Sequence, residues 1–129
     1  MLRAEGLPCV FARHARLAEA TRVAARHWKF EMVALEPAEY SNVVTALFVP
    51  DGFDERTLRS LILDKFNMSL GSGLGKLAGR AFRIGHLGDF NELMLAGTLA
   101  GVEMGLALAG IPHQRGGVDA ALQYLTGRA

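Results

Sequence analysis

The sequence contains only one cysteine, Cys9, among its 129 residues, which excludes a disulfide within the chain. A lone thiol fits a reducing compartment, so we expect the protein in the cytoplasm. No sign of charge dominates either, because 14 Lys and Arg residues are balanced by 13 Asp and Glu residues. Nucleic-acid binding requires an excess of basic side chains on one surface, so we expect no nucleic-acid partner.

The sequence also lacks a secretion signal and a convincing membrane span. Residues 1–9 contain no apolar core of the kind that signal peptides have. The apolar run at residues 93–111 is nearly long enough to cross a bilayer, but Glu103 lies in its middle. Because a charge at the bilayer centre is costly, we expect no membrane association and instead a helix buried on both sides in a soluble assembly.

Motifs of the common metal and nucleophilic sites are absent as well. The four histidines show no metal-ligand spacing; they are His14, His27, His86 and His113. No Ser/His/Asp or Cys/His arrangement stands out either. The glycine-rich stretch 71–79, GSGLGKLAG, matches neither the P-loop nor the dinucleotide-binding fingerprint. We therefore expect no metal, and we interpret this stretch as a flexible connection whose glycines permit positive φ.

The length is that of one domain, and half of the residues are hydrophobic, which is enough for a core. We expect residues 1–129 to form a single domain of the α+β class. The periodicity predicts helices at 6–28, 55–67, 90–110 and 118–125, and strands near 30–36, 43–49, 68–70 and 81–87. The order α-β-β-α-β-β-α-α indicates a small, mostly antiparallel sheet with helices packed on one face.

The first predicted helix carries arginines at positions 13, 16, 22 and 26 beside its apolar positions. A basic amphipathic helix suits a membrane or an acidic partner. The alternative is a face that is simply exposed to solvent, with Glu19 reducing its charge. We favour the solvent-exposed face.

The apolar helix carries Gly97, Gly101 and Gly105, which lie four residues apart and so share one face. Such a ladder allows another backbone to approach closely. The approaching element is either the sheet of this domain or a partner that this chain lacks. Apolar residues surround the helix, so packing against one of its faces cannot bury them all.

Arg83 is the residue that we single out as a candidate binding group. It lies between Phe82 and Ile84 in the predicted strand 81–87, and side chains alternate between the two faces of a strand. If the two neighbours point into the core, Arg83 faces a cleft or another domain. A guanidinium on a rigid strand can bind a carboxylate through two parallel hydrogen bonds. Periodicity alone favours an arginine exposed to solvent.

Residues 41–113 run from SNVVTALFVPDG to MGLALAGIPH and contain the specific motif GLGKLAGRAFRIGHLGDFNE at 73–92. This stretch resembles the C-terminal part of serine–glyoxylate aminotransferases, in the class V group of pyridoxal-phosphate enzymes. Related alanine–glyoxylate aminotransferases share a G-G-L-G pattern followed by R-I-G. The opening, residues 5–22, is similar to the helix that joins the large domain of that family to its small domain. Residues 28–40 follow the family only loosely.

The resemblance implies an aminotransferase small domain at 29–129, preceded by a helix, 1–28, that would connect to a large domain missing from this chain. In the family, the arginine of R-I-G binds the α-carboxylate of the substrate, and this role falls on Arg83. The cofactor lysine belongs to the large domain, and no lysine of this chain lies in a comparable context. We therefore expect no catalytic and no cofactor-binding residue here, with pyridoxal phosphate bound only by full-length family members.

Three functional interpretations stay open at this point. The chain is an inactive remnant of an aminotransferase, or half of a split transaminase completed by a separate large-domain chain, or a non-catalytic binding or oligomerisation module. The missing lysine predicts no transaminase activity from the isolated chain. The surface that a large domain would cover predicts self-association or a large-domain partner.

Overall fold

The computed structural model describes residues 2–127 of the chain. It begins with a short helix, α1 (Leu2–Glu5), and a long helix, α2 (Leu7–Trp28). The 3₁₀ turn η1 (Pro37–Glu39) is followed by strand β1 (Val44–Phe48), helix α3 (Glu55–Phe66) and strand β2 (Gly71–Ser72). After the turn η2 (Gly75–Leu77) come strand β3 (Ala81–Gly85) and helices α4 (Glu92–Leu108) and α5 (Gly117–Leu125).

Side-chain caps explain where two of the helices begin. Asp54 accepts a hydrogen bond of 2.8 Å from the backbone N–H of Arg56 at the start of α3. Asn91 accepts one of 2.9 Å from the backbone N–H of Met94 at the start of α4. Helix α3 ends at Asn67, whose φ of 53° is the left-handed conformation that stops a helix. The sequence predicts these boundaries to within two residues.

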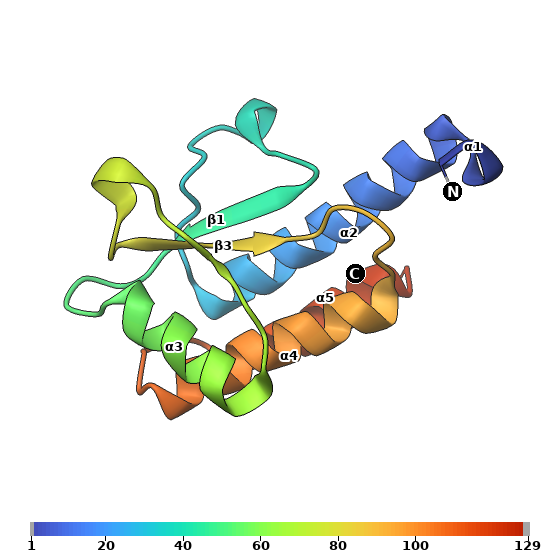
Figure 1. The fold of residues 1–129 in the computed structure, drawn as a ribbon. Coiled ribbons are helices and arrows are strands. Elements are labelled where there is room, and N and C mark those ends of the chain that lie inside the picture. Colours follow the sequence, from blue (N-terminus) through green and yellow to red (C-terminus); the bar gives the residue numbers. More distant parts are fainter. Residues whose placement is uncertain (1, 128–129) are drawn as a thin grey trace.

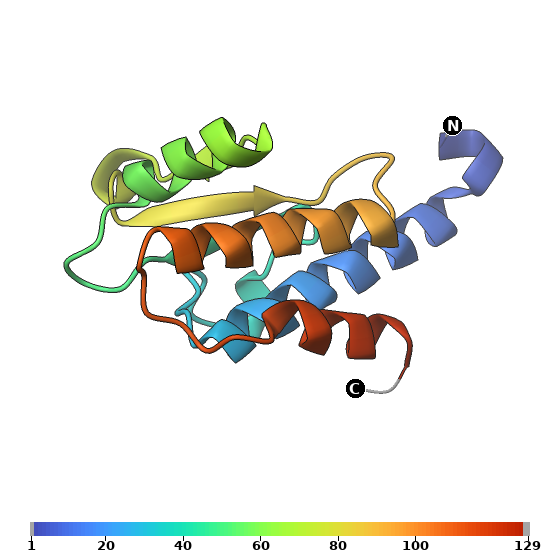
Figure 2. The ribbon, with the colours of Figure 1, turned by 90° about the horizontal axis from the view of Figure 1, so that it is seen from below.

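Within the described residues, three strands form one antiparallel sheet in the order β1-β3-β2. The register places Leu47 opposite Phe82, and Ala46 opposite Arg83. Leu47, Phe82 and Ile84 are fully buried and join one core cluster with residues of α2, α3 and α4. The opposite face, with Ala46 and Arg83, is partly exposed. Helix α5 packs along α2 (Figures 1 and 2). The predicted α+β fold, with a small antiparallel sheet, is confirmed.

The predicted strand at 30–36 is wrong. Only Met32 pairs in β fashion, through an isolated bridge to Leu47, and two further backbone hydrogen bonds connect this segment to β1. The segment then turns away from the sheet into η1, which starts at Pro37. Proline lacks the N–H of a β ladder, so the segment cannot extend as a regular strand past residue 36.

The predicted strand at 68–70 is also misplaced. Pairing with β3 begins at Gly71 and Ser72, inside the stretch that we interpreted as a connection. A Cβ atom at position 71 would lie 3.0 Å from Nε of Arg83. The strands can therefore pair here because glycine leaves room for the arginine.

The glycine ladder of α4 serves packing within the domain at two of its three positions. A Cβ atom at Gly105 would lie 2.4 Å from Cγ1 of Ile62, and one at Gly101 would lie 2.8 Å from Cε of Met68. The face of α4 that carries Gly101 and Gly105 thus approaches α3 and the segment after it. Nothing lies within 4 Å of the same atom at Gly97, which is exposed.

Within this chain helix α4 is buried on one side, and the expectation that an assembly buries both of its sides stays a prediction. Leu99 and Leu106 lie in the core, whereas Leu93 and Leu108 are 84% and 57% exposed. Among the described residues, the structure contains no helix with the length and apolarity needed to cross a membrane.

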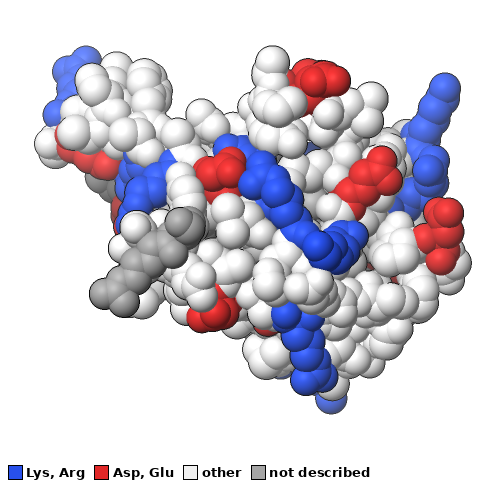
Figure 3. All heavy atoms as spheres, turned by 180° about the vertical axis from the view of Figure 1, so that it is seen from behind, with Lys and Arg blue, Asp and Glu red and all other residues white. Residues whose placement is uncertain are grey.

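The arginines of α2 are paired with glutamates of this chain, and Glu19 reduces the charge of this face, as the favoured interpretation expects. Arg22 departs from that interpretation, because it is buried. Each of the arginines has a partner within the chain: Arg13 with Glu5, Arg16 with Glu92, and both Arg22 and Arg26 with Glu19. On the face seen from behind, positive and negative side chains are interspersed (Figure 3). The charge of these arginines is therefore largely compensated inside the molecule.

Candidate functional site

Arg83 lies in the central strand of the sheet, between β1 and β2. The residues opposite it are Ala46 on one side and Gly71 on the other, and both have little or no side chain. Its neighbours in the strand, Phe82 and Ile84, are fully buried, while Arg83 itself is half-buried. The strand alternation thus directs Arg83 to the face away from the core, where its side chain lies against Gly71.

The guanidinium of Arg83 is held at one nitrogen and open at the other two. Nε donates a hydrogen bond of 2.8 Å to the carbonyl oxygen of Ser72. Within residues 2–127, neither terminal nitrogen makes a hydrogen bond, and no carboxylate lies within ion-pair distance. A guanidinium anchored at Nε presents Nη1 and Nη2 as a fork that matches the two oxygens of a carboxylate.

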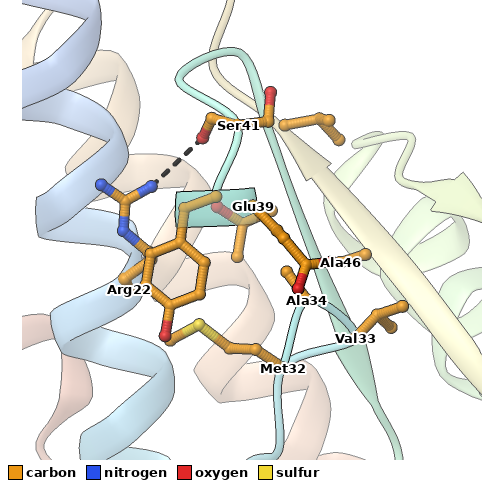
Figure 4. Close-up of a pocket in the computed structure, with 10 residues that line it drawn as sticks. Arg22, Met32, Val33, Ala34, Glu39, Ser41 and Ala46 are labelled. Atoms are coloured by element: carbon orange, nitrogen blue, oxygen red, sulfur yellow. Dashed lines mark hydrogen bonds between the residues drawn. The ribbon is translucent and has the colours of Figure 1, made fainter. Parts of the chain in front are cut away.

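A cavity of about 290 Å³ lies between α2, the loop after it and β1 (Figure 4). Arg22 stands on one side of it, and Met32 and Ala34 on another. Nη1 of Arg22 donates a hydrogen bond of 3.1 Å to the carbonyl oxygen of Ser41. The guanidinium of Arg22 lies 5.0 Å from the centre of the Tyr40 ring. No motif in the sequence indicates this cavity. Its arginine is already engaged, and Arg83 does not line it.

His86 follows β3 and is completely buried. Its Nε2 lies 2.9 Å from Oγ1 of Thr45, and its Nδ1 lies 3.1 Å from the carbonyl oxygen of Asn42. Burial lowers the pKa of His86 to about 4, so the ring is neutral at neutral pH. This histidine therefore holds the start of β1 against the end of β3.

The described residues hold no group of three or more His, Cys, Asp or Glu side chains suited to a metal ion. Both ring nitrogens of His14 are engaged in hydrogen bonds within the fold. Its Nδ1 lies 2.8 Å from the carbonyl oxygen of Val10, and its Nε2 accepts a hydrogen bond of 3.0 Å from the backbone N–H of Gly88. This histidine connects α2 to the segment after β3.

Comparisons with known proteins identify relatives of the whole chain, although no family model matches it. The chain is 43% identical over its full length to the serine–glyoxylate aminotransferase of Hyphomicrobium methylovorum, of which it covers 32%. It is 48% identical over 94% of its length to the serine–glyoxylate aminotransferase of Arabidopsis thaliana, of which it covers 30%.

Solved structures of aminotransferases share the fold of this chain. The ureidoglycine–glyoxylate aminotransferase of Bacillus subtilis matches 97% of this chain with a TM-score of 0.90 and 27% identity, over 33% of its own length. The pyridoxamine–pyruvate aminotransferase of Mesorhizobium loti matches 98% with a TM-score of 0.90 and 30% identity, again over 33% of its length. The chain matches the C-terminal part of glyoxylate aminotransferases. It spans about one third of the length of these relatives.

These aminotransferases depend on pyridoxal phosphate, which forms a Schiff base with a lysine. A Schiff-base lysine is activated by desolvation or by a neighbouring cation. Lys29, Lys65 and Lys76 are all exposed to solvent and lie on three different parts of the fold. The described lysines therefore do not fit the cofactor.

Proposed function

We propose that this chain is the substrate-binding small domain of a pyridoxal-phosphate-dependent transaminase of the glyoxylate type, without activity of its own. Residues 29–129 form that domain, and residues 1–28 connect it to a cofactor domain. The observation that carries the proposal is the open fork of Arg83, held at Nε by Ser72. The free, exposed thiol of Cys9 supports a reducing compartment, and we propose the cytoplasm.

In this proposal Arg83 binds and orients the α-carboxylate of an amino or keto acid. The hydrogen bond from Nε to Ser72 fixes the plane of the guanidinium before the ligand arrives, so less freedom is lost on binding. Two parallel hydrogen bonds from Nη1 and Nη2 then fix the direction in which the rest of the substrate points. Correct orientation of a substrate against a cofactor accounts for a large part of catalysis. The cofactor domain supplies the lysine and the electron sink.

A chimera tests this role directly. The first two thirds of the Hyphomicrobium methylovorum enzyme are joined to residue 2 of this chain, and transamination of glyoxylate is measured. Arg83→Lys is expected to lower kcat/KM by about 100-fold, because an ammonium cannot reproduce two parallel hydrogen bonds. Arg80→Lys is the matched control: Arg80 is exposed, with its guanidinium 5.5 Å from the centre of the Phe48 ring. Equal effects of the two substitutions would contradict the proposal.

A further inference from the structure

The glycine-rich stretch 71–79 has a closely packed backbone and lies against the start of β3. Gly73 is buried within it: a Cβ atom there would lie 2.3 Å from the carbonyl oxygen of Leu77 and 2.8 Å from that of Ala81. Glycine alone leaves room for this approach. Backbone hydrogen bonds of 3.0 to 3.1 Å close the stretch, from Leu77 to Leu74, from Ala78 to Gly75 and from Arg80 to Leu77.

Gly71, the first residue of the stretch, lies under the side chain of Arg83. A Cβ atom at position 71 would lie 3.0 Å from Nε, 3.1 Å from Cβ and 3.3 Å from Cζ of Arg83. Three atoms along one side chain are thus close to the same point, so the arginine runs across β2 at Gly71. From there its Nε reaches the carbonyl oxygen of Ser72, the next residue, at 2.8 Å.

The absence of a side chain at position 71 permits this conformation of the arginine. The Cβ atom of any other residue would come closer to Arg83 than the roughly 3.5–4.0 Å at which non-bonded carbon atoms pack. The arginine would have to move away, and the hydrogen bond from its Nε to Ser72 would lengthen or break.

Gly85 provides a comparison on the same strand. It lies two residues beyond Arg83 in β3, and side chains two residues apart share a face of the sheet. Gly85 is exposed, and nothing lies within 4 Å of a Cβ atom at this position. A side chain at position 85 would therefore leave the arginine where it is, whereas one at position 71 would not.

We propose that Gly71 is a positioning residue for substrate binding. It lets Arg83 lie across β2, where the carbonyl oxygen of Ser72 holds the guanidinium with Nη1 and Nη2 open to a carboxylate. A binding group that is oriented before the ligand arrives loses less freedom on binding. The inference rests on the proposed function and adds to it the residue that orients the binding group. Gly71 acts through Arg83.

The first test observes the guanidinium of Arg83 in the isolated chain by NMR. The Nε–H resonance is assigned by its absence from the spectrum of Arg83→Lys, and its exchange with water is measured. Gly71→Val is expected to make this exchange about fivefold faster, the factor that corresponds to the loss of one hydrogen bond. Gly85→Val is the matched control and is expected to leave the exchange rate unchanged, since a Cβ atom there has no neighbour within 4 Å.

Either of two results of this test would overturn the proposal. One is an unchanged exchange rate of the Arg83 Nε–H in Gly71→Val, and the other is an equal acceleration in Gly85→Val. Valine favours strands, so the pairing of β3 is expected to persist in both variants, which exchange of the β3 backbone N–H groups checks. If that pairing is lost, Gly71→Ala replaces Gly71→Val, because alanine adds only the Cβ atom, and an unchanged rate then has the same meaning.

The second test uses the chimera with the Hyphomicrobium methylovorum cofactor domain. Gly71→Val is expected to raise KM for glyoxylate about tenfold and to change kcat by less than about twofold, because a displaced arginine weakens binding of the carboxylate throughout the reaction. A variant with a damaged fold would instead lower kcat at unchanged KM, since less of the protein is active. That result would overturn the positioning role.

The two proposals fail in different ways. If Arg83→Lys lowers kcat/KM of the chimera and Gly71→Val does not, the positioning role of Gly71 fails and the substrate role of Arg83 stands. If neither substitution affects the chimera, the proposed function fails, and the substrate role of Gly71 fails with it. The exchange measurement in the isolated chain involves no turnover, so it tests the contact between Gly71 and Arg83 in either case.

Discussion

The indole nitrogen Nε1 of Trp28 donates a hydrogen bond of 2.8 Å to Oε1 of Glu103. The same oxygen accepts hydrogen bonds of 2.9 Å from the backbone N–H groups of Gly116 and Gly117. One carboxylate of α4 thus joins the end of α2 to the start of α5. Burial raises the pKa of Glu103, but these hydrogen bonds lower it more, and the pKa lies below its ordinary value. The charge in the apolar run is therefore a structural connection.

Glu103→Leu is expected to lower the free energy of unfolding by about 3 kcal/mol, because three hydrogen-bond donors lose their acceptor. Glu103→Gln keeps an oxygen acceptor and is expected to cost about 1 kcal/mol. Urea denaturation of both variants checks the difference. If the two substitutions cost the same, the hydrogen bonds do not hold the three helices together.

Two glycines of the same helix are expected to respond to alanine in opposite directions. Gly97→Ala should raise stability by about 0.5–1 kcal/mol, since alanine favours the helix and its Cβ meets nothing within 4 Å. Gly105→Ala should lower stability by about 1–3 kcal/mol, since its Cβ would lie 2.4 Å from Ile62. Thermal melts of the two variants measure both changes in stability. A loss of stability in Gly97→Ala would show that this position is packed.

The stability of the chain is expected to fall between pH 6.5 and pH 4 because of His86. Its pKa is lowered to about 4 in the folded state, whereas an unfolded histidine titrates near 6.5. In that window the unfolded chain binds a proton that the folded chain does not, so unfolding becomes easier as the pH falls. The loss amounts to roughly 3 kcal/mol at pH 4.

His86→Asn serves as the comparison for this pH dependence. The variant is expected to be less stable at pH 7, because it loses buried contacts, but to show a flatter profile of unfolding free energy between pH 6.5 and 4. Denaturation curves at several pH values measure both profiles. Parallel profiles would mean that another group causes the pH dependence.

Arg83→Ala is expected to change the stability of the isolated chain by about 1 kcal/mol or less. The substitution removes one hydrogen bond to the Ser72 carbonyl and no ion pair. A large loss of stability in a denaturation experiment would show that Arg83 is a structural residue.

The isolated chain is also expected to bind serine or glyoxylate too weakly to detect. An exposed arginine–carboxylate pair contributes at most about 1 kcal/mol, whereas millimolar affinity requires about 4 kcal/mol. An NMR titration up to ten millimolar ligand measures this. A saturable shift of resonances near Arg83 would show that this chain alone builds a complete pocket.

No transamination is expected from the purified chain with added pyridoxal phosphate. Its lysines are exposed and lack the desolvated setting that activates a Schiff-base lysine. The assay follows conversion of glyoxylate to glycine with serine or alanine as amino donor. Turnover above that of free pyridoxal phosphate would refute the expectation and assign a catalytic lysine to this chain.

Features that depend on neighbours in the chain were predictable from the sequence. The caps Asp54 and Asn91, the apolar periodicity of α2 and the alternation around Arg83 are local patterns, and the structure contains all of them. A helix start or the face of a strand residue depends on steric and hydrogen-bonding preferences within a few residues. The family resemblance rests on such a local motif too, at residues 73–92, and the comparisons confirm it.

Features that depend on distant partners were decided only by the tertiary structure. The sequence does not reveal that Glu103 meets Trp28, that Gly105 is packed while Gly97 is open, or that residues 30–36 form a single bridge. Each outcome depends on which segments the chain brings together, and side chains far apart in sequence leave no periodic signal. The apolar groove between Leu7, Phe11, Val43 and Leu87 belongs to this class, because its walls come from three segments that meet only in the fold.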